Sequence, residues 1–147
     1  MLRLSPKKFH VTGLAMGPVE ELDLQLGERQ SGLSVEALVG GPSTVVIMIF
    51  LRLIIEDGIG IRVNYAGDFD IVDPDVPNFA VTEQILSNTF IQVNAPAIAY
   101  PFLRAYISTL TVNSGFEQVL LPPVNFQAIF DKRKKNEGEV TSKIEVR

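Results

Sequence analysis

Few residues of this chain have the types and spacing that catalysis or metal binding requires. His10 is its single histidine and follows Lys7 and Lys8, so no second imidazole can share a metal ion with it. A run of aspartates from Asp68 to Asp75 offers the oxygen ligands that calcium prefers. It lacks the central glycine and the terminal glutamate of an EF-hand loop. We therefore expect a solvated strand end there, with no bound metal ion and no cofactor.

Other motifs with chemical potential are also incomplete. The segment Gly40-Gly-Pro-Ser-Thr44 is similar to a phosphate-binding loop, but no lysine precedes its hydroxyl residues and a strand-like run follows it. The basic run Lys132 to Lys135 is typical of a solvated helix C-terminus. The chain has no cysteine, which excludes thiol nucleophiles, disulfides and cysteine-ligated metals. The sequence therefore predicts a protein that is not an enzyme.

The composition indicates one apolar, acidic domain. The chain has 147 residues, of which 46% are hydrophobic, a mean hydropathy of +0.22 and a formal net charge of -4. The negative charge argues against nucleic-acid binding. The N-terminus shows no signal-peptide pattern, and the longest apolar run, Val45 to Leu51, is too short to cross a membrane. We expect a cytoplasmic protein without membrane insertion, folded over residues 1–130, with a polar and mobile tail over residues 131–147.

The elements that must position any site begin with strands and end with helices. Strands are predicted near residues 9–14, 33–39, 44–55 and 59–66, and residues 19–31 form a long connection after the first. The turn Glu56-Asp-Gly58 joins the last two strands as a hairpin. A weakly helical pattern follows from Asn78, and a stronger helix begins near Pro96. A short helix follows a possible N-cap at Asn125.

The strand from Val45 to Leu51 is apolar on both faces, and two helices are too few to cover both faces of a four-stranded sheet. The helix after Pro96 is also apolar around most of its circumference. A homo-oligomer would bury both surfaces. The alternative is a sheet with helices on one face and the connection over residues 19–31 on the other.

Three segments near the C-terminus resemble a known family in order and spacing. They are Tyr100-Pro-Phe-Leu-Arg-Ala-Tyr-Ile-Ser108, then Gly115-Phe116, and then Leu120-Leu-Pro-Pro-Val-Asn-Phe-Gln-Ala-Ile-Phe130. Together they resemble the signature end of the SecB family of protein-export chaperones. Residues 2–71 agree with that family in the order of their elements alone.

The resemblance implies an α+β fold: a four-stranded antiparallel sheet with a long crossover after the first strand, and two C-terminal helices packed on one side. It implies a homotetramer built as a dimer of dimers. It also implies an ATP-independent holdase that binds unfolded or non-native polypeptides, such as preproteins destined for export, and passes them to the motor SecA.

By the same resemblance, a client-binding groove is lined by apolar residues of the crossover, the second strand and the last helix. The helix after Pro96 forms the contact between dimers. The implied groove residues are Leu22, Leu24, Leu26, Leu33, Val35, Ala37, Phe126, Ile129 and Phe130, and the implied interface residues are Phe102, Leu103, Tyr106, Ile107 and Leu110. Each groove residue is equally explained as ordinary core.

The sequence departs from the export chaperones on one strand, in the crossover, which lacks the aromatic residue often found there, and in the tail. Arg62 and Asn64 stand on the strand where those proteins carry acidic residues that engage SecA, which weakens the expectation of a SecA contact. The tail is locally basic where theirs is acidic. A SecB-like adaptor or dedicated chaperone of one partner, such as an antitoxin, therefore stays open as the second hypothesis. A small-molecule enzyme is the third hypothesis.

Overall fold

A computed structural model describes residues 1–135 and 142–144 of the chain. Its sheet is antiparallel, with the strand order β1-β4-β3-β2-β5. The four long strands confirm the expected four-stranded sheet, and a three-residue strand is added at one edge. The strands are β1 (Arg3–Pro18), β2 (Ser31–Gly41), β3 (Thr44–Ile54), β4 (Ile59–Val72) and β5 (Ser142–Ile144).

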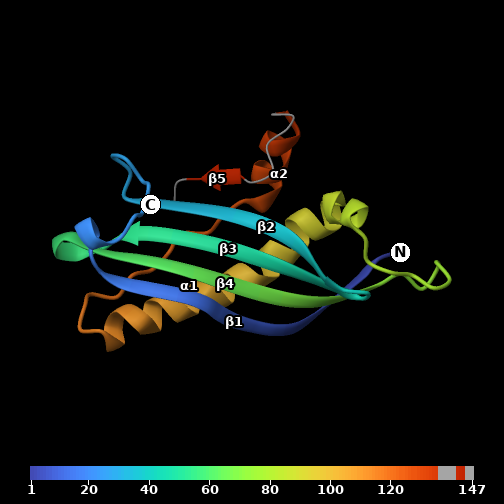
Figure 1. Cartoon of the computed structure of the whole chain (residues 1–147), viewed down its shortest axis with the longest axis horizontal. Helices are drawn as coiled ribbons and strands as arrows, with labels where there is room; N and C mark the ends of the chain where they lie inside the picture. Colours follow the sequence, from blue (N-terminus) through green and yellow to red (C-terminus); the bar gives the residue numbers. More distant parts are fainter. Residues whose placement is uncertain (136–141, 145–147) are drawn as a thin grey trace.

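Two helices pack on one face of this sheet. They are α1 (Ala95–Asn113) and α2 (Phe126–Lys135). In Figure 1 the strands lie in front, and α1 runs diagonally behind them. Within the described residues, no helix is long and apolar enough to cross a membrane. The remaining helical elements are short: η1 (Val19–Glu21), η2 (Glu56–Gly58), η3 (Glu83–Ser87) and the π-helical η4 (Phe90–Asn94).

Alternation along β3 shows which face of the sheet is covered. Ile47, Ile49 and Leu51 are fully buried toward the helices, whereas Met48 and Phe50 on the other face are half-buried. Successive side chains of a strand point to opposite faces, so the helices cover one face only. We call the face that carries Ile47 and Ile49 the inner face and the face that carries Met48 and Phe50 the outer face.

The long connection after β1 covers one end of the outer face. A Cβ atom on Gly60 would lie 2.9 Å from Leu24 Cδ1, and one on Gly32 would lie 3.1 Å from Leu26 Cδ2. Leu24 and Leu26 are therefore buried where β4 and β2 each have a glycine, which has no side chain to keep them away from the backbone. This part of the outer face agrees with the alternative left open by the sequence, in which the connection over residues 19–31 covers that face.

The turn between β3 and β4 confirms the expected hairpin. Residues Glu56–Gly58 form one turn of 3₁₀ helix, and Gly58 adopts a φ of 72°, a conformation that glycine tolerates best. The weak helical pattern expected from Asn78 is confirmed only from Glu83, because Ile85 and Leu86 lie in the 3₁₀ helix η3 and Val81 does not. The Val81 amide instead donates to the Pro42 carbonyl of the β2–β3 turn at 2.7 Å.

α1 packs its buried stripe on the inner face. Ala95, Ala99, Leu103, Ile107 and Thr111 recur every four residues and are fully buried. The helix starts one residue before the expected Pro96, and Pro101 lies in its second turn on the exposed side. A proline has no amide to donate, and its ring disturbs the preceding turn of the helix. Because Pro101 lies on the exposed side, this disturbance is away from the contact between α1 and the sheet.

The loop between the two helices is fastened along α1 by several hydrogen bonds. Tyr100 Oη donates to the Pro122 carbonyl at 2.6 Å, and Arg104 Nε donates to the Leu121 carbonyl at 2.8 Å. Further along, Thr111 Oγ1 accepts from the Val119 amide at 3.1 Å. These bonds fix where the loop delivers the start of α2.

Asn125 caps that start, as expected. Its Oδ1 accepts from the Ala128 amide at 3.0 Å, which satisfies one of the free donors of the first turn. α2 then continues to Lys135, so the expected domain boundary at residue 130 falls inside a helix. Ser142–Ile144 pair with Leu33–Val35 of β2. The rest of the expected mobile tail, residues 136–141 and 145–147, lies outside the described residues.

The hydrogen bond of Tyr100 gives a pH-dependent prediction. At pH 7, Tyr100→Phe should lower the free energy of unfolding by about 1 kcal/mol, because the partly buried Pro122 carbonyl loses its donor. Burial raises the pKa of the Tyr100 hydroxyl to about 12 from the ordinary 10.0. The unfolded chain therefore loses this proton first as pH rises, and the wild type loses stability above about pH 10.

The variant has no such proton, so the stability difference between the two proteins should shrink from pH 10 upward. Urea unfolding at a series of pH values measures it. Burial also raises the pKa of Tyr65, but both proteins share that residue. A difference that stays constant up to pH 11 would contradict the role given to Tyr100.

Candidate functional site

The structure does not bring the nine predicted groove residues together. Six of them are almost fully buried within the single chain, and they divide between the two faces of the sheet. Leu22, Ala37 and Phe130 stay half-buried. The six buried residues are Leu24, Leu26, Leu33, Val35, Phe126 and Ile129.

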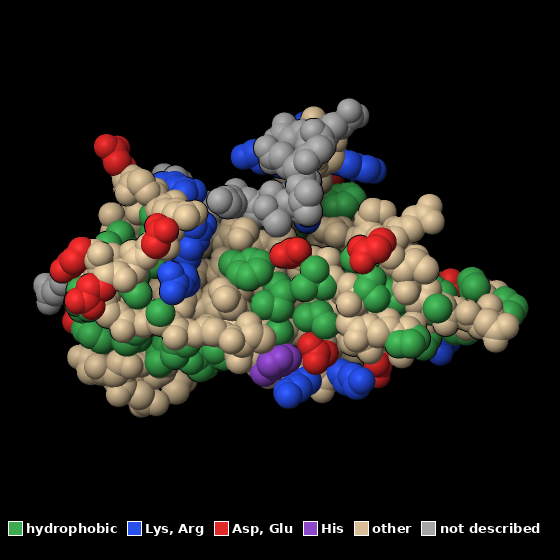
Figure 2. Space-filling model, in the orientation of Figure 1, with side chains coloured by type: hydrophobic (Ala, Val, Ile, Leu, Met, Phe, Trp, Pro, Cys, Tyr) green, Lys and Arg blue, Asp and Glu red, His purple; other side chains and the backbone are tan. Residues whose placement is uncertain are grey.

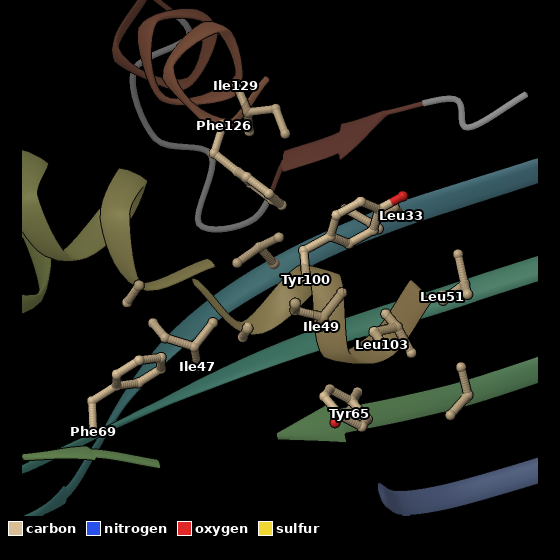
Figure 3. Close-up of a cluster of buried hydrophobic side chains, with 14 of the residues drawn as sticks. Leu33, Ile47, Ile49, Leu51, Tyr65, Phe69, Tyr100, Leu103, Phe126 and Ile129 are labelled. Carbon is tan, nitrogen blue, oxygen red and sulfur yellow. The ribbon is translucent and has the colours of Figure 1, made fainter. Parts of the chain in front are cut away.

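Four of the six form core between β2 and α2. Phe126 and Ile129 of α2 lie above β2 and its Leu33, and the ring of Tyr100 lies beside them (Figure 3). The rings of Phe126 and Tyr100 meet edge to face, with centroids 5.7 Å apart. Leu33 and Val35 belong to the same buried cluster. A groove between β2 and α2 is thus filled by the chain's own side chains.

The crossover leucines lie on the outer face, away from α2. Gly32 and Gly60, which they cover, alternate along their strands with the inward-facing Leu33 and Ile61. The sheet therefore separates the crossover leucines from the α2 residues. Among the residues that the structure describes, the two sets therefore do not line one groove.

The predicted interface residues are also divided. Leu103 and Ile107 are fully buried in the core and present no surface to a partner. Tyr106 and Leu110 are half-buried, whereas Phe102 is 51% exposed. Phe102 stacks on Phe9 of β1, with ring centroids 4.3 Å apart. The outward side of α1 next to β1 is therefore the apolar surface that this helix leaves open.

Sequence reasoning predicted the strand and named Ala37 as a groove residue, but it missed that the second half of β2 lies at a sheet edge. β5 pairs only with Leu33–Val35, so within the described residues no strand pairs with the outer edge of residues 36–41. Leu38 and Val39 point to opposite faces and are 40% and 37% exposed. A strand edge with free N–H and C=O groups and exposed apolar side chains is a template for another extended chain. No pattern in a single sequence identifies which strand lies at an edge.

A cavity lies beside α2, near this edge. It has a volume of about 340 Å³ and is lined by Ser87, Gln92, Phe130, Arg133 and Lys134. η3, which ends at Ser87, contacts β2. The Lys134 ammonium lies 5.6 Å from the centre of the Phe130 ring, and Arg133 Nη1 donates to Gln92 Oε1 at 2.7 Å.

The charge of Arg133 links the cavity to β2. Burial lowers the pKa of its guanidinium from the ordinary value, while the negative charge of Glu36 on β2 acts in the opposite direction. Arg133 therefore lies within electrostatic reach of the free part of β2. We define the β2-edge surface as residues 36–41 together with Phe130 and this cavity.

In the described part of the chain, three of the aspartates considered as calcium ligands contact positively charged groups. Lys7 lies 3.6 Å from Asp70, and the amino group of Met1 contacts Asp73 and Asp75. That contact lowers the pKa of Asp73. No group of three acidic, histidine or cysteine residues among the described residues is arranged to hold a metal ion.

Comparison with known proteins agrees with this architecture. The family model described as "Preprotein translocase subunit SecB" matches residues 59–137, which contain β4, both helices and the loop that joins them. The structure is also similar to a Mycobacterium tuberculosis SecB-like chaperone that was solved in complex with a ChAD peptide from an antitoxin. The TM-score is 0.60 at 17% identity, over 83% of this chain and 88% of that chain.

Similar sequences agree as well. A protein-export protein SecB of Ehrlichia canis is 32% identical over 79 residues, which are 53% of this chain and 45% of that protein. An uncharacterized protein of Methanocaldococcus jannaschii is 35% identical over 69 residues, 46% of this chain and 44% of that protein. The aligned part spans a little under half the length of these curated relatives. Because the family model covers more than half of the chain, and the fold agrees, the chain belongs to the SecB family.

Proposed function

We propose that this protein is an ATP-independent holdase for unfolded or non-native polypeptides. The observation that carries the proposal is the β2-edge surface, where backbone that no other described strand pairs with lies next to exposed apolar side chains and a cavity. Membership of the SecB family supports it. No catalytic step is part of the proposal, and the protein is proposed to work in the cytoplasm.

Two physical effects make such a surface suitable for clients of many sequences. Backbone hydrogen bonds to a strand edge are the same for every residue except proline, so they add affinity with little sequence preference. Burial of the client's apolar side chains against Leu38, Val39 and Phe130 adds further affinity, and this contribution does not depend on a particular orientation of those side chains. A protein that binds the unfolded state preferentially holds that state away from aggregation and needs no fuel.

The residues that line the proposed client surface differ from the expected groove. Ala37 and Phe130 remain proposed lining residues because they stay partly exposed. The buried Leu33, Val35, Phe126 and Ile129 support the surface from beneath. Phe126→Asp is therefore expected to destabilise α2 rather than to weaken client binding selectively.

We also propose that the chain assembles as a homotetramer, a dimer of dimers, through the open side of α1. Phe102 and Val112 are each 51% exposed on this helix, and Leu14 of β1 is 46% exposed. Apolar side chains of this size on one side of a helix are typical of a subunit contact.

A dedicated chaperone or adaptor for one partner is the second candidate. The observation that favours it is the fold similarity to a SecB-like chaperone solved with an antitoxin peptide. Affinity capture from the native host separates the two candidates. Many unrelated unfolded proteins indicate a general holdase, whereas one stoichiometric partner indicates the adaptor.

Client binding is tested by Val39→Asp with Val72→Asp as a matched control. The two valines are 37% and 46% exposed, but Val72 lies on β4, which β3 separates from β2. Suppression of the aggregation of a chemically denatured client is measured without ATP. Val39→Asp should raise the concentration needed for half suppression several-fold, because a charge must be desolvated at the contact, while Val72→Asp matches the wild type.

If wild-type protein leaves aggregation unchanged, the holdase proposal fails. Equal weakening by the two variants would remove the assignment to the β2 edge. Circular dichroism and thermal melts of each variant show whether it is folded.

Assembly is tested by the mass of the wild type and of Phe102→Asp in light scattering. The wild type should have the mass of a tetramer, and the variant should have a lower mass because a carboxylate replaces an apolar contact. Leu120→Asp is the control, since Leu120 is 72% exposed on the loop between the helices. A monomeric wild type, or an unchanged mass for Phe102→Asp, would contradict the proposed interface.

A further inference from the structure

Three arginines converge at one end of the outer face. Arg52 of β3 and Arg62 of β4 are directly opposite each other in the sheet. Arg29 comes from the crossover, and its positive charge contributes to a lowered pKa of Arg52, after the larger effect of burial. Like charges directly opposite on neighbouring strands destabilise a sheet. We call this set the arginine cluster.

No carboxylate of the described chain neutralises the cluster. None of its three guanidinium groups forms an ion pair within the described residues. Arg52 Nη1 donates to the Leu24 carbonyl at 2.8 Å, and Arg29 Nε donates to the Leu26 carbonyl at 3.0 Å. Arg52 Nε and Nη2 are buried and have no hydrogen-bond partner. Buried donors of a cation without an anionic partner are costly to retain.

The cluster also stands out against the charge of the rest of the chain. Residues 1–130 contain 13 acidic and seven basic residues, and three of the seven belong to the cluster. In Figure 2 the Lys and Arg side chains form a band across the outer face, on the side of the crossover. Hydrophobic side chains lie next to that band (Figure 2). On this face Met48 and Phe50 of β3 are half-buried.

We propose that the outer face binds a short acidic segment of a protein partner, with carboxylates on the arginine cluster and apolar side chains against Met48 and Phe50. Guanidinium groups match carboxylates with two parallel hydrogen bonds, and Arg62 is exposed to receive one. The partner is distinct from the client of the β2-edge surface, because the arginine cluster lies level with Gly32 of β2, at the other end of that strand from residues 36–41.

The surroundings of the cluster favour a short acidic peptide over a nucleic acid. Further along the outer face, Glu36 and Asp68 lie opposite Met48 and Val46. Glu28 and Asp23 lie in the crossover itself. A polynucleotide carries a phosphate at every step and would be repelled beyond the cluster, whereas a segment with a few acidic residues meets only the arginines.

The test uses a short fluorescein-labelled peptide of Glu-Leu-Glu-Ser repeats and the full chain, followed by fluorescence anisotropy. Arg62→Glu is compared with Lys8→Glu. Both change the net charge equally, and Lys8 lies on the same face, opposite Asp68 on β4. Arg62→Glu should weaken binding by about tenfold, the size of a lost charged contact at an interface rim. Lys8→Glu and Val39→Asp should bind the peptide like the wild type.

Three further results complete the test. A peptide with glutamine in place of glutamate should bind at least about tenfold more weakly, and an increase from about 0.05 M to about 0.5 M salt should weaken the acidic peptide. Equal effects of Arg62→Glu and Lys8→Glu would overturn the proposal, as would a glutamine peptide that binds equally well. Tighter binding of a single-stranded DNA oligonucleotide would also overturn it. Because Arg62→Glu should suppress client aggregation normally, failure here is distinguishable from failure of the holdase proposal.

Discussion

The contact between α1 and the inner face of the sheet is the interaction on which the rest of the structure depends. Its stripe of Ala95, Ala99, Leu103 and Ile107 closes the core over β3 and β4. With this helix in place, Tyr100 and Arg104 can hold the following loop, and that loop delivers α2 to β2. Because both helices lie on one side, neither helix covers the outer face of the sheet, and the crossover covers only one end of it.

The sequence was sufficient for the fold because its signals are local. Alternation along residues 59–65, the turn at Gly58 and the cap at Asn125 each depend on near neighbours, and the family signature supplied the order of the elements. Expectations about the site were less accurate. Leu33, Phe126 and Ile129 have the same apolar pattern whether they line a groove or fill a core. Only the placement of α2 over β2 shows that they are buried.

The order of residues along the chain also does not reveal which strand lies at an edge of the sheet, or which charged side chains come together. Arg29, Arg52 and Arg62 are far apart in sequence, and strand register together with the crossover places them at one end of the outer face. Likewise, β2 could be predicted as a strand, but only the structure shows that, among the residues it describes, β5 pairs with Leu33–Val35 alone. Two surfaces of opposite character result: an apolar strand edge suited to unfolded chains, and a basic patch suited to acidic ones.

The central claim is that unfolded polypeptide binds along the free edge of β2. Hydrogen–deuterium exchange of the protein, alone and with a permanently unfolded client, measures this directly. Backbone pairing would slow amide exchange in residues 36–41, and contact with Phe130 would slow exchange around the middle of α2. Unchanged exchange in both segments, with protection elsewhere in the chain, would contradict the account.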